Sequence, residues 1–250
     1  MVLGAANNTT VHYLVLTLNR SSTRRSWVQE TRLSIPSLEV VRAINGFDER
    51  ETVRALAQSG LRYHVFTYCG FSRFGTYGSL ACFLTKVIAL ASQVRRRLPY
   101  MAMLEDDMRI KPNFPTFIEQ RVARHFGDGD SSVSPELLVL GSWGEGYVTS
   151  LAGARRVLQS LRHQGIPMNV DIMLNEGHVG RVERVQGTPW RHRVAPNFGD
   201  IQSTPHVRRE LLMREGLALP PGQHCASAQC QSWVREARAR YCRGRPSQPT

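Results

Sequence analysis

Hydrophobic residues along this chain form short continuous runs and longer stretches with a spacing of three and four. Residues 12–18 are a nearly continuous β-prone apolar run followed by a polar stretch, which predicts a buried strand. A helix over about residues 25–33 and a second short strand near residues 38–43 complete a strand–helix–strand unit. The unit ends at the turn formed by Asn45 and Gly46.

The longest apolar stripe follows a glycine-rich stretch at residues 70–78. Its apolar residues recur at spacings of three and four, which predicts a long helix with one apolar face, ending before Pro99. These residues are Leu80, Phe83, Leu84, Val87, Ile88, Ala91 and Val94. Cys82 falls on the same face, and we expect it in the core. Residues 100–104 then form a short apolar strand.

The rest of the pattern alternates between helix and strand. It predicts a helix at residues 114–126, strands at 137–140 and 147–150, and an amphipathic helix from residue 151 to residue 161. This order favours the α/β class, with a central, mostly parallel sheet flanked by helices. We expect one domain over residues 1–205. Residues 206–250 are expected to add peripheral helices and a basic tail to the same domain.

Composition narrows the classes of function. The 250 residues, 42% of them hydrophobic, suffice for the core of one large domain. The net charge of +12 suits nucleic acid, an anionic membrane or a phosphorylated small molecule as partner. The excess lies in short arginine groups without zinc-finger spacing or an aromatic-rich basic repeat, so we expect solvated faces and no nucleic acid. A basic nucleic-acid-binding protein stays as an alternative.

The sequence contains few indications of targeting, and its cysteine spacing points to no particular kind of site. No run approaches the roughly eighteen apolar residues of a membrane span, and residues 1–10 lack the features of a secretory signal. We therefore expect no transmembrane segment and favour a cytoplasmic location. The five cysteines include no CxxC pair, so neither a zinc site nor a full disulfide framework follows.

Three acidic residues, Glu105, Asp106 and Asp107, come directly after an apolar strand. Unpaired carboxylates are costly to bury, so this cluster needs cations. Mg²⁺ and Mn²⁺ prefer oxygen ligands, and a carboxylate pair at a strand end can share such an ion with a diphosphate. The structural interpretation is that Asp106 and Asp107 cap a turn or pair with Arg109 and Lys111. Spacing alone leaves both interpretations open.

Four sequence blocks occur in one order over roughly residues 11–205. They are VLTLNR (15–20) with INGFD (44–48), GSLACFLTK (78–86), YMAMLEDDM (100–108), and GYVTSLAGA (146–154) with PMNVD (167–171). In order and spacing the chain resembles glycosyltransferase family 25, the lipooligosaccharide and procollagen galactosyltransferase group. It departs from that family at Asn19, where the family commonly has aspartate, and at Thr85 and Lys86, which replace a Ser-His pair.

The resemblance implies a Rossmann-like fold of the GT-A type and a metal-dependent transferase. Such an enzyme moves a hexose or related sugar from a UDP-sugar to a hydroxyl of a glycan or glycoprotein acceptor, here with inversion, using Mn²⁺ or Mg²⁺. The departures from the family pattern leave an inactive nucleotide- or glycan-binding domain as the alternative.

For the donor, the resemblance implies that the base and ribose of a UDP-sugar lie near Leu18, Asn19, Arg20 and Arg24, over the carboxyl ends of the first strands. Arginine suits a diphosphate because its planar fork donates paired charged hydrogen bonds. Arg20 is the preferred diphosphate ligand. The structural alternative for Arg24 and Arg25 is an exposed helix start.

For the metal, the resemblance implies that Asp107 is a ligand and that Glu105 faces the donor ribose or a metal-bound water. Asp106 is assigned to either role. A late histidine often completes the metal shell in GT-A enzymes, and we assign His206 to it, with His192 as the other candidate. The alternative for both is a surface histidine.

An inverting transfer needs a base that takes the proton from the acceptor hydroxyl. Asp171 is the first candidate, because it lies where the family has its "pvD" aspartate, and a helix N-cap is the alternative. Glu145 is the second candidate. Trp143, Tyr147 and Trp190 are candidates for stacking on a sugar, with core packing favoured for Tyr147.

Overall fold

The central sheet is built from the apolar runs of the sequence. The computed structural model describes residues 10–18, 20–64, 76–126, 135–141, 145–166, 174, 181–185, 190–192 and 204–219. Six strands form the sheet in the order β2-β1-β4-β7-β6-β8. Their bounds are β1 Val11–Thr17, β2 Glu39–Arg42, β4 Tyr100–Glu105, β6 Leu137–Leu140, β7 Gly146–Ser150 and β8 Val182–Val185.

The sheet is mostly parallel, with β7 running against its neighbours. β1 pairs in parallel with β2 and β4, and β6 pairs in parallel with β8. β7 pairs antiparallel with both β4 and β6. β7 runs antiparallel to β6 because the connection between these two strands is too short for a parallel crossover, which needs about a dozen residues or more. The predicted α/β class, with a mostly parallel sheet flanked by helices, is confirmed.

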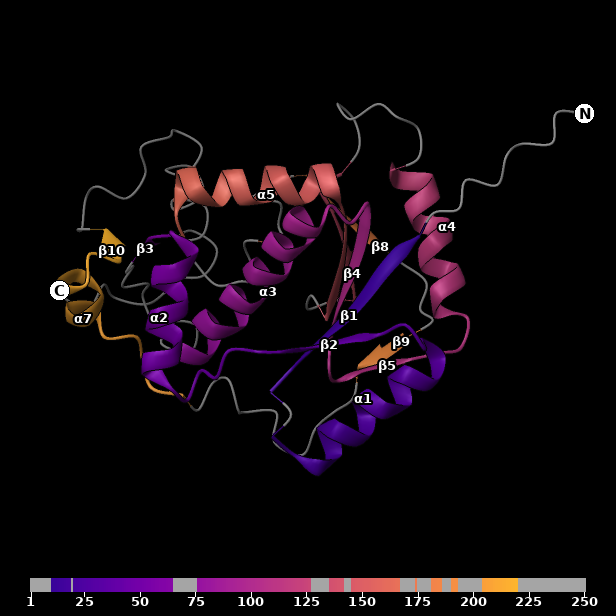
Figure 1. The fold of residues 1–250 in the computed structure, drawn as a ribbon, viewed down its shortest axis with the longest axis horizontal. Coiled ribbons are helices and arrows are strands. Elements are labelled where there is room, and N and C mark those ends of the chain that lie inside the picture. The colour runs from indigo at the N-terminus through magenta and orange to yellow at the C-terminus, as the bar shows by residue number, and fades with distance from the viewer. Residues whose placement is uncertain are drawn as a thin grey trace, which may run out of the picture.

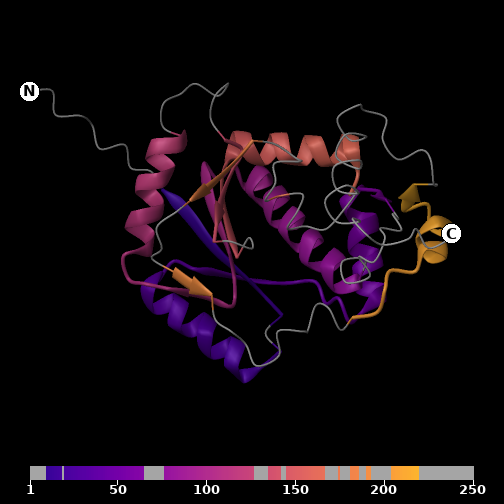
Figure 2. The ribbon, with the colours of Figure 1, turned by 180° about the vertical axis from the view of Figure 1, so that it is seen from behind.

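Helices cover both faces of this sheet (Figures 1 and 2). α1 Ser22–Ser34 and α4 Phe114–Phe126 pack on one face. α2 Glu49–Ser59, α3 Tyr77–Arg96 and α5 Leu151–Gln164 pack on the other. The result is a three-layer arrangement with a separate hydrophobic cluster on each side of the sheet.

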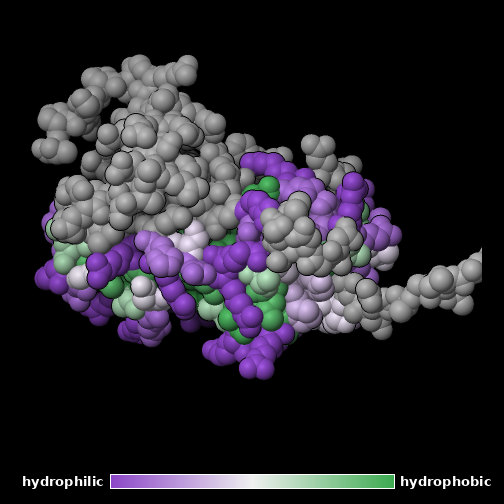
Figure 3. Space-filling model, turned by 90° about the horizontal axis from the view of Figure 1, so that it is seen from above, coloured by the Kyte–Doolittle hydropathy of each residue, from purple (hydrophilic) through white to green (hydrophobic). Residues whose placement is uncertain are grey.

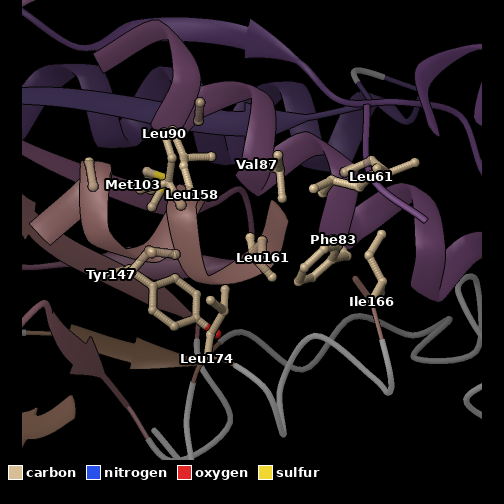
Figure 4. Close-up of a cluster of buried hydrophobic side chains, with 14 of the residues drawn as sticks. Leu61, Phe83, Val87, Leu90, Met103, Tyr147, Leu158, Leu161, Ile166 and Leu174 are labelled. Carbon is tan, nitrogen blue, oxygen red and sulfur yellow. The ribbon is translucent and has the colours of Figure 1, made fainter. Parts of the chain in front are cut away.

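Alternation along β1 shows how the strands serve both layers. Tyr13 and Val15 belong to the cluster that includes α1 and α4. Leu14 and Leu16 belong to the cluster that includes α2, α3 and α5, because successive side chains of a strand point to opposite faces. Figure 4 shows the second cluster, where Tyr147 of β7 lies near the leucines of α5 and Leu174.

Two helix starts differ from the sequence expectation. α1 begins at Ser22, before the predicted residue 25, because the side chain of Ser21 caps it by accepting a hydrogen bond from Arg24 N at 3.1 Å. α2 was not predicted at all. Its start carries a signal of its own: Asp48 accepts from the backbone N of Glu51 at 3.0 Å, the N-cap interaction of a helix.

Two short ribbons complete the described fold. β3 Tyr63–His64 pairs in parallel with β10 Ala218–Leu219, and β5 Met108–Ile110 pairs antiparallel with β9 Trp190–His192. α7 Arg209–Arg214 precedes β10. Leu212 and Ala218 are buried in the same cluster as α2 and α3, so the described part of the C-terminal region packs on the body of the sheet.

One described helix, α3, is long and apolar enough to cross a membrane by length and composition, with a mean hydropathy of 1.3. However, 72% of that stretch is buried inside the protein, between the sheet and helices α2 and α5. On the face seen in Figure 3, the described surface is mostly hydrophilic, with smaller hydrophobic areas between the polar side chains.

Candidate functional site

A cavity of 170 Å³ lies at the carboxyl ends of β1, β2 and β4. Its walls come from the residues just after β1, the 43–47 segment after β2, the first turns of α1 and α3, and the acidic turn after β4. In open α/β sheets, ligands bind at this edge of the strands. Ligand pockets usually measure about 300 to 1,000 Å³, so the described walls enclose room for part of a ligand of ordinary size.

Two glycines bring the 43–47 segment against the start of α3. A Cβ atom added to Gly46 would lie 2.3 Å from Gly78 Cα and 3.0 Å from Tyr77 O. Only a residue without a side chain permits this approach of the two backbones. Gly46 and Gly78 both line the cavity, so their contact sets the distance between two of its walls.

Asp106 is fixed in the cavity wall from two sides. One carboxylate oxygen accepts a hydrogen bond from Thr17 Oγ1 at 2.6 Å, and the other pairs with the guanidinium of Arg24. Burial raises the pKa of Asp106 above its usual range, because desolvation outweighs the opposing effects of Arg24 and Thr17. Both oxygens of Asp106 are therefore engaged by donors that the protein itself supplies.

Arg24 also reaches the next carboxylate. Its Nη1 lies 3.4 Å from Asp107 Oδ2. Burial by itself would lower the pKa of Arg24, but the negative charges of Asp106 and Asp107 outweigh it and raise that pKa. Arg24 is thus a permanently charged counter-ion for both aspartates. The structural interpretation of the acidic cluster named Arg109 and Lys111 as partners, and the structure adds Arg24 as a cation in contact with both carboxylates.

Glu105 has its own counter-ion, the buried Lys86. Lys86 Nζ lies 2.6 Å from Glu105 Oε1 and 4.9 Å from the ring centroid of Tyr147. Its side chain is 1% exposed, compared with 29% for that of Glu105. Cys82 Sγ lies 4.0 Å from the same carboxylate oxygen. The expectation that Cys82 belongs to the core is wrong: it is only partly buried and lines the cavity, because it faces the acidic turn.

Arg20 lies at the mouth of the cavity with an aromatic partner. Its Cζ is 5.0 Å from the centroid of the Phe47 ring, within the range of a cation–π contact. Phe47 is 47% exposed, and both residues line the cavity. A large exposed aromatic ring beside a cation is suited to a flat, anionic ligand such as a nucleotide.

The residues of the acidic turn fit a divalent cation in a restricted way. In the part of the chain that the structure describes, no group of three His, Cys, Asp or Glu side chains is arranged to hold a metal ion. Mg²⁺, however, is commonly held by one or two carboxylates together with substrate phosphates. Asp107 fits that requirement. Asp106 fits it less well, because both its oxygens already accept from Thr17 and Arg24.

Of the residues expected to bind the donor, Leu18, Arg20 and Arg24 line the cavity. Asn19 and Asp171 lie outside the described residues, so the assignment of Asp171 as base stays a prediction. Glu145 is buried, and its carboxylate lies against Gly141, where an added Cβ would be 1.7 Å from Glu145 Oε2. Glu145 is absent from the described lining of the cavity.

The two histidine candidates lie on different segments. His206 is exposed and forms an antiparallel bridge with Thr76, at the start of α3. His192 is the register partner of Met108, the residue that follows Asp107. The backbone of His192 is thus in register with the residue that follows the acidic turn.

The three aromatic candidates also differ in where the structure places them. Tyr147 is fully buried, as its core interpretation expects. Trp190 is also buried and packs edge-on against Phe114 and Phe117, so it belongs to the hydrophobic cluster beside α4 and does not offer a face to a sugar. Trp143 lies outside the described residues.

Sequence reasoning missed several members of the cavity. Thr17 and Lys86 bind the acidic residues, and Thr204 lines the wall and accepts from Gly78 N at 2.8 Å. A signal existed for Lys86: a lysine within an apolar helical stripe, at a position where the resembled family has histidine. No comparable signal existed for Thr17, which lies inside the strand predicted at residues 12–18.

No model of a known protein family matches the chain, and no curated protein matches it. Among solved structures, the chain is similar to a glycosyltransferase involved in the glycosylation of the major capsid of PBCV-1. The identity is 12%, the TM-score is 0.34, and the match covers 70% of this chain and 81% of that chain. A likeness at this level does not identify the substrate of this chain.

Proposed function

We propose that this protein is a glycosyltransferase that takes a sugar from a UDP-sugar and transfers it to a hydroxyl of a glycan or glycoprotein acceptor. The single observation that carries the proposal is the cavity at the carboxyl ends of β1 and β4. It joins the acidic turn to Arg20 and Arg24 in one place. The four sequence blocks similar to glycosyltransferase family 25 supply most of these residues.

The donor's diphosphate is assigned to the cationic side of this cavity. Arg20 and Arg24 present planar guanidinium groups, which donate paired hydrogen bonds to phosphate oxygens. Glu105, held by Lys86 at 2.6 Å, is assigned to the ribose hydroxyls, to which a fixed carboxylate can act as acceptor. Phe47, exposed beside Arg20, offers its ring to the flat base.

Asp107 is assigned to a divalent cation, Mn²⁺ or Mg²⁺, which when bound supplies positive charge to the leaving nucleoside diphosphate. Asp106 keeps the turn in place through Thr17, and Arg24 adds a second positive charge close to the same position. Cations aimed at the site where negative charge develops lower the barrier to departure of the nucleotide.

Deprotonation of the acceptor hydroxyl is assigned to Asp171, the position matching the "pvD" aspartate in the resembled family. A base in this role takes the proton as the hydroxyl oxygen attacks the anomeric carbon, and the transfer then inverts the configuration. Glu145 is the second candidate, although its carboxylate lies against Gly141. A His206 contribution to the metal shell is likewise part of the proposal.

A panel of nucleotide sugars, incubated with the protein with and without Mn²⁺, tests the proposal. We expect release of UDP from one or more UDP-sugars, faster with Mn²⁺ than with a chelator. Release of GDP or CMP at equal rates from their sugars would remove the UDP assignment. The absence of any donor cleavage, combined with tight binding of UDP, would instead indicate a catalytically inactive nucleotide-binding domain.

A further inference from the structure

Arg24 occupies the place that the proposed function assigns to a divalent cation. Its guanidinium contacts Asp106 and lies 3.4 Å from Asp107 Oδ2, so one side chain serves both carboxylates as counter-ion. A cation that binds through Asp107 Oδ2 has to share or replace this contact. Arg24 and such a cation are therefore competitors for that oxygen atom.

The surroundings of Arg24 allow its side chain to exchange one ionic partner for another. Its backbone N is held by the Ser21 cap at 3.1 Å, which keeps the start of α1 in place. Its side chain is 27% exposed, so water reaches it and its terminal bonds can rotate. Asp106 does not depend on Arg24 for its orientation, because Thr17 holds its other oxygen at 2.6 Å.

The charges of the cavity balance before any ligand arrives. The described lining contains three cationic side chains and three anionic ones: Arg20, Arg24, Lys86, Glu105, Asp106 and Asp107. Each phosphate of a nucleotide-sugar diphosphate carries one negative charge. Either the diphosphate or a divalent cation alone would leave a double charge in a partly desolvated cavity, which is unfavourable. The two together preserve the balance.

We propose that Arg24 is an exchangeable counter-ion that couples the binding of a divalent cation to the binding of the donor diphosphate, an inference that rests on the proposed function. Without ligands it neutralises Asp106 and Asp107. When the diphosphate arrives, Arg24 turns to it and yields Asp107 to the cation. Each ligand therefore raises the affinity of the other by the same factor, as linkage requires.

Isothermal titration calorimetry of the full chain with MnCl₂ alone, UDP alone, and each in the presence of the other measures this coupling. In the wild type we expect weak Mn²⁺ binding without nucleotide and a gain in UDP affinity on the order of 5- to 150-fold with Mn²⁺, the usual range of coupling between sites. In Arg24→Gln we expect tighter Mn²⁺ binding without nucleotide, weaker UDP binding, and a smaller coupling factor.

Two variants serve as controls. Arg25→Gln removes a charge from the next position, which is exposed and outside the described lining of the cavity, and should leave all the affinities unchanged. Arg24→Lys keeps a cation and should keep Mn²⁺ binding weak. If Arg24→Gln does not fold, the wild type alone still tests the proposal, because an equal UDP affinity with and without Mn²⁺ would contradict the coupling. Circular dichroism checks the fold of each variant.

The outcomes separate the two proposals. If wild-type protein binds UDP with Mn²⁺, but Mn²⁺ alone binds equally tightly to wild type, Arg24→Gln and Arg24→Lys, the counter-ion role is wrong and the proposed function stands. If the wild type binds no UDP under any condition, the proposed function fails and the counter-ion role fails with it.

Discussion

Lys86 Nζ lies 2.6 Å from Glu105 Oε1, with the Lys86 side chain 1% exposed and above the ring of Tyr147. This buried lysine is the counter-ion of a carboxylate that lines the candidate donor cavity. A buried cation is costly unless its acidic partner remains in place. The pair therefore ties a cavity residue to the hydrophobic core beneath it.

Replacing Lys86 by methionine should weaken donor binding and the fold together. Glu105 would keep its negative charge but lose the positive charge of Lys86, and the cavity would gain one net negative charge. We expect UDP affinity to fall by about tenfold, or about 1.4 kcal/mol, and the free energy of unfolding to fall by about 1 to 3 kcal/mol. Urea denaturation and calorimetry measure the two effects.

Lys111→Met is the matched control for this change, because Lys111 is the chain's other lysine and is exposed. It should alter stability by no more than about 0.5 kcal/mol and leave UDP affinity unchanged. Equal effects of the two substitutions would show that net charge, and not the pair with Glu105, determines donor binding.

Asp107→Asn should nearly abolish transfer while the fold stays intact. The amide keeps the shape of the side chain but removes the charge that holds a cation, so turnover should fall on the order of 10²-fold or more. Glu105→Gln should have a milder effect, because an amide can still accept a hydrogen bond from a ribose hydroxyl. Steady-state rates with a UDP-sugar and Mn²⁺ decide this, and an Asp107→Asn protein with normal turnover and normal Mn²⁺ affinity would make the acidic turn structural.

Asp171→Asn separates binding from chemistry. If Asp171 is the acceptor base, turnover should fall by about 10²- to 10⁴-fold, with UDP and Mn²⁺ affinities almost unchanged. Asparagine caps a helix about as well as aspartate, so a capping role predicts normal turnover and a normal melting temperature. That second pattern would remove Asp171 from the mechanism, and Glu145→Gln would be measured next.

The contact among Glu49, Tyr77 and Arg208 predicts a pH effect. Burial by itself would raise the pKa of Glu49, but hydrogen bonds from Tyr77 at 2.7 Å and Arg208 at 2.6 Å outweigh it and lower that pKa below 4.5. A lowered carboxyl pKa gives stability that is present above the ordinary pKa and is lost as pH falls through the lowered one. This contact joins α2 and the start of α3 to the segment before α7.

The melting temperature of wild type should therefore exceed that of Glu49→Gln at pH 7, and the difference should shrink steadily as the pH falls below 4.5. Glu210→Gln, an exposed carboxylate two residues from Arg208, should differ little from wild type over the whole range. A Glu49→Gln difference that is equally large at pH 7 and at pH 3 would contradict the assignment.

Much of the fold could be predicted from apolar periodicity. The predicted helix at 114–126 coincides with α4 Phe114–Phe126, and the predicted strand at 137–140 coincides with β6 Leu137–Leu140. α2 was not predicted because its apolar positions are few, although the Asp48 cap and the acidic first turn mark its start. β8 Val182–Val185 carries charged residues at its centre and pairs at the edge of the sheet, so its sequence lacks the pattern of a buried strand.

The site is harder to predict, because its contacts join distant segments. The acidic turn and the arginines were identified separately, but the contact of Arg24 with Asp106 spans 82 residues and that of Thr17 with Asp106 spans 89. Such pairs depend on the placement of β1 beside β4, which periodicity does not specify. Lys86 illustrates the same limit: its charge is visible in the sequence, whereas its partner Glu105 is visible only in the fold.

The most direct test of the central claim, that the cavity around Asp107 binds the nucleoside diphosphate of a UDP-sugar, is thermal unfolding of wild type and Asp107→Asn with UDP, GDP or CMP, with and without Mn²⁺. A ligand at about 100 times its Kd adds about 2.7 kcal/mol to the stability of the folded state. We expect UDP with Mn²⁺ to raise the wild-type melting temperature by about 5 to 10 °C, with a smaller rise for UDP alone and little for GDP, CMP or the variant. Equal shifts with all three nucleotides, no response to Mn²⁺, or the same shift in Asp107→Asn would contradict the claim.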